Sequence, residues 1–315
     1  MKKILLFLIF ASCFLLKARA QDDLLASLAK EDSAKVKQNI ATATFKSTRI
    51  INMQSVEMTG KGNLEFMISH HFGNAWNSGA GWQNVAHLFG LNSGVATTYL
   101  SFDYSFTDWF NMGFASTGNS KFESWAKFRL LRQQTGLKNI PVTVDWFSLV
   151  NIDATAGPST DDLAWNRLSF IHQLLIARKF SENFSLQLIP SYIHYNVVPY
   201  GYNNSNNIFS IGIGGRYKLT HKTAITFEYS RQLNAYKDLL DETASAVNYV
   251  PDLISLGYDW DTGGHIFQFF LTSTTSSTNI AQLTTNMNNF AKGNISLGFT
   301  INRSYGIKRV VKAHQ

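Results

Sequence analysis

Cysteine is nearly absent and charged residues are scarce in this chain of 315 residues. The single cysteine, Cys13, lies in an N-terminal apolar run, so the rest of the chain has no disulfide, thiolate nucleophile or cysteine-ligated metal site. Charged residues make up 16% of the chain, against roughly 25% in soluble domains. The 45% hydrophobic content excludes a disordered chain. Something other than charge must therefore make the surface compatible with its solvent.

The first 20 residues have the pattern of a secretory signal peptide. Lysines at the start precede an apolar run over 4–16, and Ala18 and Ala20 supply the small residues of an A-x-A cleavage site. The run is shorter than the roughly 20 residues of a membrane-spanning helix, so we expect cleavage after Ala20. A lipoprotein signal with Cys13 as its acceptor is the alternative.

The formal net charge of +7 does not indicate nucleic-acid binding. Four basic residues leave with the signal peptide, and four more lie near the C-terminus, at positions 303, 308, 309 and 312. Residues 21–302 then sum to about −1. Because no basic stripe remains on the folded part, no nucleic acid is expected as a partner.

Apolar residues alternate with small or polar ones again and again after residue 60, as in 100–106, 209–217 and 295–301. This period of two predicts β-strands. No run after the signal reaches 18 apolar residues, which excludes membrane-spanning helices. There are about twelve such segments, within a range of about 10 to 14, each near the 9–11 residues of a tilted membrane-spanning strand.

The two faces of these strands favour a membrane protein. One face is rich in aromatic and aliphatic residues, and the other is small, polar or sometimes charged. A soluble β-sandwich, the alternative, would carry Lys, Glu and Thr on its outward face. Lipid outside and a polar lumen inside match the observed pattern better. We therefore predict an all-β fold, an antiparallel up-and-down transmembrane β-barrel over 61–303.

Connection lengths predict the orientation of the barrel. Long connections are expected at 74–94, 153–164, 196–207, 232–252 and 273–294, and tight ones at 107–109, 181–183, 220–222 and 261–264. Outer-membrane barrels have short periplasmic turns and longer extracellular loops. An even strand count then places both termini in the periplasm of a Gram-negative bacterium. Pro190 lies inside a strand of a barrel that has no edge, so we expect a β-bulge there.

Residues 21–60 precede the first strand. They are expected to form an N-terminal periplasmic segment or a plug in the lumen, and an extra strand within 44–60 is a further alternative. Residues 304–315 form the basic C-terminal tail.

Several short motifs resemble a family of Bacteroidota outer-membrane β-barrel proteins whose domain has no known function. They are the residues at 44–52 (TFKSTRIIN), 60–66 (GKGNLEF) and 127–133 (KFRLLRQ). The similarity extends from about Gln21 to the last strand. It implies an outer-membrane barrel and no particular activity. The chain departs from many such barrels at its end, where it continues past Tyr305 into the basic tail.

Charged residues on the polar strand faces are the candidate lumen-lining residues. They are Asp103, Glu123, Lys127, Arg129, Asp145, Arg216, Lys218, Glu228 and Asp259. Inside a barrel, water or an opposite charge must satisfy each of them. If they pair across the lumen they close it, and if water fills the lumen they set its ion preference.

No motif predicts a catalytic, metal or cofactor site. His70 and His71 are neighbours on a strand and point to opposite faces, so they cannot share a metal ion. Ser69 and His71 have the spacing that a lipase acting on the barrel wall would need, but no third residue marks an orienting partner. A pair formed on adjacent strands remains open.

Three functions follow in order of preference. The first is a narrow, porin-like passive pore for small polar solutes, without a cofactor. The second is a closed structural or partner-binding barrel, whose loop contacts would include Trp76, Trp82, Tyr200 and Tyr202. The third is an outer-membrane hydrolase, although an enzyme is not our prediction. The expected partners are outer-membrane lipid, the machinery that assembles barrels and, at the loops, an unknown protein.

Overall fold

The computed structural model describes residues 38–76, 97–118, 120–155, 164–198, 205–234, 239–240, 246–247, 252–286 and 288–307. The expected signal peptide, the loop residues Trp82, Tyr200 and Tyr202, and the end of the basic tail lie outside these residues. The chain divides into two compact units, a smaller one of Met1–Ile40 with Gln133–Pro141 and a larger one of Ala41–Arg132 with Val142–Gln315.

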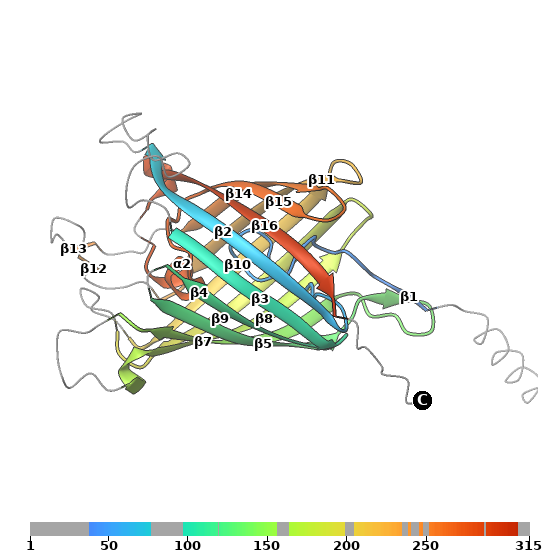
Figure 1. Ribbon diagram of the computed structural model, residues 1–315, viewed down its shortest axis with the longest axis horizontal. Coiled ribbons are helices and arrows are strands. Elements are labelled where there is room, and N and C mark those ends of the chain that lie inside the picture. The colour runs from blue at the N-terminus through green and yellow to red at the C-terminus, as the bar shows by residue number, and fades with distance from the viewer. Residues whose placement is uncertain are drawn as a thin grey trace, which may run out of the picture. The chain divides into compact units, whose positions relative to one another are not determined.

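Twelve strands of the larger unit close into an antiparallel barrel (Figure 1). They are β2 (Asn63–Trp76), β3 (Thr97–Thr107), β4 (Phe110–Thr117), β5 (Lys121–Leu131), β7 (Thr143–Asp153), β8 (Leu168–Lys179), β9 (Phe184–Tyr195), β10 (Asn207–Lys218), β11 (Thr223–Gln232), β14 (Leu253–Asp261), β15 (Ile266–Thr272) and β16 (Ile295–Gly306). Each barrel strand pairs with the next barrel strand along the chain, and β16 pairs with β2 to close the ring. The predicted fold class and strand count are confirmed.

The alternation in sequence becomes an alternation in burial. In β10, Phe209 is 50% exposed while Ser210, its neighbour, is 2% exposed, and the same inversion runs through the other barrel strands. Aromatic and aliphatic side chains form the outer wall. Most inward side chains are small, polar or charged, but a group of large apolar ones on β7, β8 and β9 also faces inward: Phe147, Leu149, Ile171, Leu175, Ile189 and Ile193. This is the arrangement of a barrel surrounded by lipid rather than by water.

The remaining elements are short. In the smaller unit, β1 (Asn39–Ile40) pairs with β6 (Gln134–Thr135). In the larger unit, β12 (Leu239–Leu240) pairs with β13 (Ala246–Val247), and the helices are η2 (Ala164–Arg167), α2 (Asn279–Thr284) and η3 (Phe290–Lys292). Among the described residues, no helix is long and apolar enough to cross a membrane.

The predicted β-bulge at Pro190 is wrong. On both sides of this residue the register between β8 and β9 is the same, because Gln173 pairs with Ser191 and Ile176 pairs with Leu188. The two intervening pairs are missing, whereas Pro190 keeps its pairing with Ile211 in β10. The wall thus accommodates the absent N–H by giving up local hydrogen bonds with β8 instead of inserting an extra residue.

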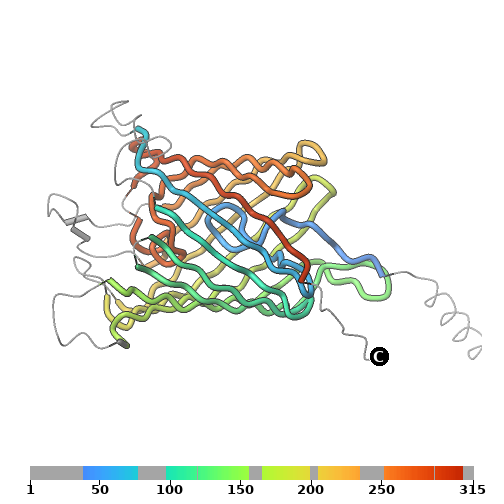
Figure 2. The backbone as a smooth tube through the Cα atoms, in the orientation of Figure 1, coloured from blue at the N-terminus to red at the C-terminus, as the bar shows by residue number. Residues whose placement is uncertain are grey.

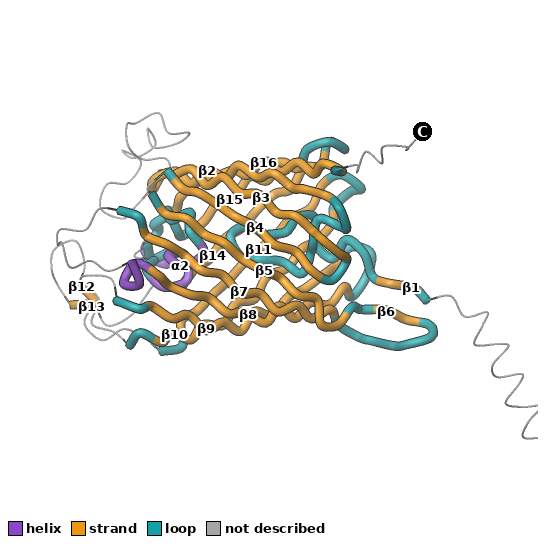
Figure 3. Tube along the Cα trace, turned by 60° about the horizontal axis from the view of Figure 1, so that its bottom comes forward, coloured by secondary structure: helices purple, strands orange, loops and turns teal. Residues whose placement is uncertain are grey.

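The interior of the barrel is occupied by the chain itself. Residues 44–57, which we call the inserted segment, enter the lumen before β2 begins (Figure 2). A second stretch, 273–286, carries α2 inside one end of the barrel (Figure 3). Nearly all residues of both stretches are buried.

Candidate functional site

The inserted segment forms a loop that is closed on itself. An isolated bridge joins Arg49 to Gln54, and the amide of Ile50 donates to the carbonyl of Met53 at 2.9 Å. In the described ladders, the segment pairs with no strand of the wall. Residues 44–57 therefore lie in the lumen and add no strand to the wall.

Glu228 binds the tip of this loop. Its carboxylate, on the inner face of β11, accepts hydrogen bonds from the backbone N–H groups of Ile51 (2.7 Å), Asn52 (3.0 Å) and Met53 (2.7 Å). The side-chain amide of Asn52 donates to the same carboxylate at 3.2 Å. Glu228 is 1% exposed, so these bonds must compensate the burial of its charge. Because its N–H groups converge on one anion, the tip is held as a unit.

Lys127 and Arg129, both on the inner face of β5, bind carbonyl groups of the same loop. Lys127 Nζ donates to three of them at 2.7 to 3.4 Å, the shortest contact being to Ser55. Arg129 Nη2 donates to the carbonyl of Val56, and the guanidinium also makes two hydrogen bonds to Asp145, at 3.1 and 3.2 Å. Cations thus hold the loop from one wall while an anion holds it from another.

Glu123 attaches the second interior stretch. The backbone N–H and side-chain amide of Asn279, the first residue of α2, donate to its carboxylate at 2.8 and 2.6 Å. The hydroxyl of Tyr99 donates to it as well, at 2.8 Å. Asp103, on the neighbouring inner wall, accepts from Trp125 Nε1 at 2.9 Å. These two carboxylates therefore have partners inside the lumen.

The last three candidate residues, Arg216, Lys218 and Asp259, lie on β10 and β14. Asp259 accepts a hydrogen bond from Gln268 at 2.8 Å, and Arg216 Nε lies 4.0 Å from its other oxygen. Lys218 is the final residue of β10 and is half-buried. The nine candidates thus lie on several parts of the inner wall, and Glu228, Lys127 and Arg129 contact the inserted segment directly. Two ion pairs among them join residues on nearby strands, Arg129 with Asp145 and Arg216 with Asp259.

Inward-facing glycines receive the apolar side chains of the loop. The contacts are Met53 on Gly212, Ile50 on Gly214 and Ile51 on Gly257. A Cβ atom on Gly214 would lie 2.5 Å from Ile50 Cδ1, closer than side-chain carbons approach one another. The glycine-rich stretch of β10 is thus a packing surface for the loop.

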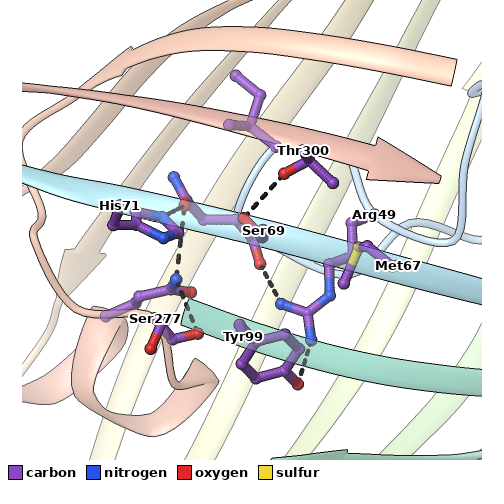
Figure 4. Close-up of a pocket in the computed structure, with 10 residues that line it drawn as sticks. Arg49, Met67, Ser69, His71, Tyr99, Ser277 and Thr300 are labelled. Carbon is purple, nitrogen blue, oxygen red and sulfur yellow. Dashed lines mark hydrogen bonds between the residues drawn. The ribbon is translucent and has the colours of Figure 1, made fainter. Parts of the chain in front are cut away.

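A small polar cavity lies beside Arg49 (Figure 4). The guanidinium donates to the hydroxyl of Tyr99 at 2.5 Å and to the carbonyl of Asn52 at 3.3 Å, and its carbon lies 4.5 Å from the Tyr99 ring centre. Ser69 and His71 complete this side of the cavity, whose volume of about 10 Å³ suits one water molecule. Arg49 Nε and His71 Nδ1 are buried and have no hydrogen-bond partner in the described protein.

His70 and His71 point to opposite faces of β2, as neighbours on a strand must, and Ser69 does not bond His71. His71 faces the lumen, where its Nε2 lies 2.7 Å from Asn52 Oδ1, and His70 faces outward, where its Nδ1 lies 3.0 Å from Thr98 Oγ1. Ser69 accepts from Thr300 at 2.8 Å instead of pairing with His71. Within the described ranges, no cluster of three His, Cys, Asp or Glu residues could hold a metal ion.

Sequence reasoning missed the residues of the inserted segment that contact the wall, above all Arg49 and Asn52, and also missed Asn279. The only signal was the polar and apolar mixture of 44–60, because a loop has no periodicity that would assign its side chains to a face.

The family model described as "Membrane bound beta barrel domain (DUF5777)" matches residues 45–305. This chain belongs to that family of membrane-bound β-barrels. The match begins inside the inserted segment, so the plug is part of the family domain. No curated protein matches the chain significantly.

Several solved barrels are similar in structure. The KdgM porin is 6% identical, with 77% of this chain and 99% of the porin covered and a TM-score of 0.44. The NanC porin is 7% identical, with 78% and 100% covered and a TM-score of 0.46. An outer membrane channel from Pseudomonas putida F1 is 13% identical, with 78% and 96% covered and a TM-score of 0.44.

Proposed function

We propose that this chain is a narrow outer-membrane channel for small polar solutes, whose lumen is closed at rest by the inserted segment. The observation that supports this most is how the segment is attached. It is a separate loop, bound to the wall through Glu228, Lys127 and Arg129 rather than through a continuous strand ladder. Each of these contacts can be exchanged for water when the loop moves, and the inward charges of β5 and β11 would then line the opening.

The proposal places the barrel in the outer membrane of a Gram-negative bacterium, with both termini in the periplasm. It supposes export by the N-terminal signal, insertion by the barrel assembly machinery and a lipid environment around the apolar wall. Transport would follow the solute gradient and need no cofactor.

A permanently closed barrel is the second candidate. Its support is the fit of three apolar side chains into glycine recesses, which gives the loop a packed core as well as polar contacts. In that case the loops at the barrel ends would carry the function, by binding a partner.

A reversible disulfide between the inserted segment and the wall distinguishes the gated channel from the permanently closed barrel. Ile50 Cγ2 lies 3.5 Å from the position of a Cβ on Gly214, so Ile50→Cys combined with Gly214→Cys brings two thiols within reach of a disulfide. The expected mature chain has no other cysteine. Conductance of the refolded protein is measured in a planar bilayer before and after reduction, with each single variant as a control.

A gated channel gives discrete openings in the single variants and the reduced double variant, and silence in the oxidised double variant. Openings that persist in the oxidised protein would contradict gating by the segment. Silence of all forms, with the barrel inserted and folded, would favour the closed barrel.

A further inference from the structure

Two stretches of the chain enter the lumen from opposite rims. The inserted segment shortly precedes β2, whose first residue, Asn63, pairs with the end of β16. The second interior stretch, 273–286, follows β15 at the other rim, where Thr272 pairs with Ser296 near the start of β16. Figure 3 shows α2 of this stretch inside that end of the barrel. A molecule that enters from either rim therefore meets one of the two stretches.

The two stretches contact each other directly. Gln282 Nε2 of α2 donates to Asn52 Oδ1 at the tip of the inserted segment, at 3.4 Å. In the other direction, Gln54 Nε2 of the inserted segment donates to Asn279 Oδ1 at 3.4 Å. All four side chains are at most 5% exposed. Because a buried amide that loses its partner is costly, removing one stretch leaves polar groups of the other unsatisfied.

Tyr99, on the inner face of β3, joins both stretches to the wall. Its hydroxyl accepts hydrogen bonds from Arg49 Nη2 of the inserted segment at 2.5 Å and from Asn279 Nδ2 at 3.3 Å. It donates its proton to Glu123 at 2.8 Å. A hydroxyl has one proton and two acceptor positions, so all three are used. Figure 4 shows Arg49 and Tyr99 in this arrangement.

Apolar side chains of both stretches pack in the same core. Ile50 and Met53 of the inserted segment and Ile280 and Leu283 of α2 belong to one buried apolar cluster. Each of them is at most 8% exposed. Withdrawal of one stretch would therefore open a cavity in the cluster that also holds the other.

Each stretch also has an attachment to the wall that the other does not share. Among the described residues, Glu228 makes its hydrogen bonds to the inserted segment alone. Thr284 Oγ1 of α2 lies 2.6 Å from the hydroxyl of Tyr195 on β9 and donates to the carbonyl of Ile280. These attachments can be removed one at a time while the contacts between the two stretches are kept.

We propose that the two interior stretches form one interlocked gate, in which neither stretch leaves the lumen without the other. The proposal rests on the gating role of the inserted segment proposed above and extends the gate to the rim of the long connections. A solute that displaces α2 at that rim then releases the segment that enters from the opposite rim. The gate thus transmits an event at one end of the barrel to the other end.

The test loosens one stretch and measures the opening of both. Thr284→Ala loosens α2, and Glu228→Ala loosens the inserted segment. Trypsin cleavage after Arg49 reports on the inserted segment. The reaction of N-ethylmaleimide with Thr278→Cys, placed in every protein, reports on the second interior stretch. Arg49 and Thr278 are at most 5% exposed, so both rates follow the population of the open state.

We expect each variant to accelerate both reactions by the same factor, because an interlocked gate has a single open state. For Thr284→Ala the factor should be about two- to tenfold, the range of one neutral hydrogen bond. Glu228→Ala should accelerate both reactions about tenfold or more. Tyr195→Phe removes the contact with Thr284 from the side of the wall and should act as Thr284→Ala does.

Thr285→Ala is the matched control, because among the described residues its hydroxyl bonds only the carbonyl of Ala281 in its own helix. It should leave both rates unchanged. A heat-dependent shift in gel mobility shows that each variant is folded. If each variant accelerates only the reaction of its own stretch, or if none accelerates either reaction, the proposal is overturned.

Conductance in a planar bilayer separates this result from the channel function. Channel openings in a protein whose two stretches respond independently would keep the channel and overturn the interlocked gate. Equal factors for the two reactions in a protein that stays silent would keep the interlock and overturn the channel.

Discussion

At the residue scale, single inward charges in this barrel each satisfy several backbone groups of the inserted segment. Glu228 is the clearest case, because three consecutive backbone N–H groups have it as their acceptor. A buried N–H that loses its acceptor costs about 1–3 kcal/mol, so the loss of one side chain affects the whole tip of the loop.

Glu228→Ala should therefore release the inserted segment while the barrel stays closed. The segment contains Arg49, which is 5% exposed and protected from trypsin while the loop is in place. We expect cleavage after Arg49 to accelerate about tenfold or more, because cleavage follows the population of the open loop. Mass spectrometry of the fragments gives the rate.

Ser230→Ala, at the next inward position of β11, is the control and should leave the cleavage rate unchanged. Equal rates of cleavage after Arg49 in the wild type, Glu228→Ala and Ser230→Ala would mean that Glu228 does not determine the position of the loop.

The alternation of residues along each strand was enough to predict which charged side chains face the lumen. The side chains of Asp103 and Glu228 lie on the inner face because their neighbours in sequence are aromatic and face lipid. Their partners could not be predicted, because those partners come from a loop and from α2.

At the element scale, the inserted segment and β10 fit each other as side chains and recesses. Ile50 occupies the space that a side chain at position 214 would fill. The alternation of residues predicted β10 as a strand. It did not predict that the glycines of β10 contact the inserted segment, because a glycine indicates a close approach without identifying the group that approaches. The β-bulge predicted at Pro190 is absent for a related reason: a closed barrel can lose two pairs between neighbouring strands and still keep the same register on both sides of the gap.

A double-mutant cycle tests this fit. Gly214→Ala should destabilise the protein by about 1–3 kcal/mol through overpacking, and Ile50→Ala by about 2–5 kcal/mol through the cavity it leaves. Combined, the two should cost less than the sum of their separate effects by about 1 kcal/mol or more, because the new methyl occupies part of the cavity. The free energy of unfolding in urea provides the measurement.

Gly118→Ala is the control for this cycle, because a Cβ there would have no atom within 4 Å. Its effect should be small and should add to that of Ile50→Ala. Strict additivity in the Gly214 cycle would show that the two residues do not touch in solution.

At the scale of the whole molecule, the ends of the barrel differ. Asn63 at the start of β2 pairs with Gly306 at the end of β16, so the barrel begins and ends at one rim. The short connections 108–109, 180–183, 219–222 and 262–265 lie at this same rim, and the connections at the other rim are longer. Two connections depart from this rule: 118–120 is short at the other rim, and 132–142, between β5 and β7, is long at this one. Parity along a closed antiparallel sheet fixes only that successive connections alternate between the rims, and the spacing of the strand segments in the sequence predicted their lengths.

Surface labelling of intact cells tests the orientation that follows. Thr155→Cys places a thiol at the rim of the long connections, and His221→Cys places one in a short turn. Both positions are exposed. Because periplasmic turns are short in outer-membrane barrels, a polyethylene glycol maleimide too bulky to cross the outer membrane should label Thr155→Cys only. Permeabilising the outer membrane should make His221→Cys react as well. Labelling of either variant is seen as a band shift on a denaturing gel.

The opposite pattern would reverse the barrel in the membrane and place both termini at the cell surface. Labelling of both variants in intact cells would mean that the two rims are not separated by a membrane.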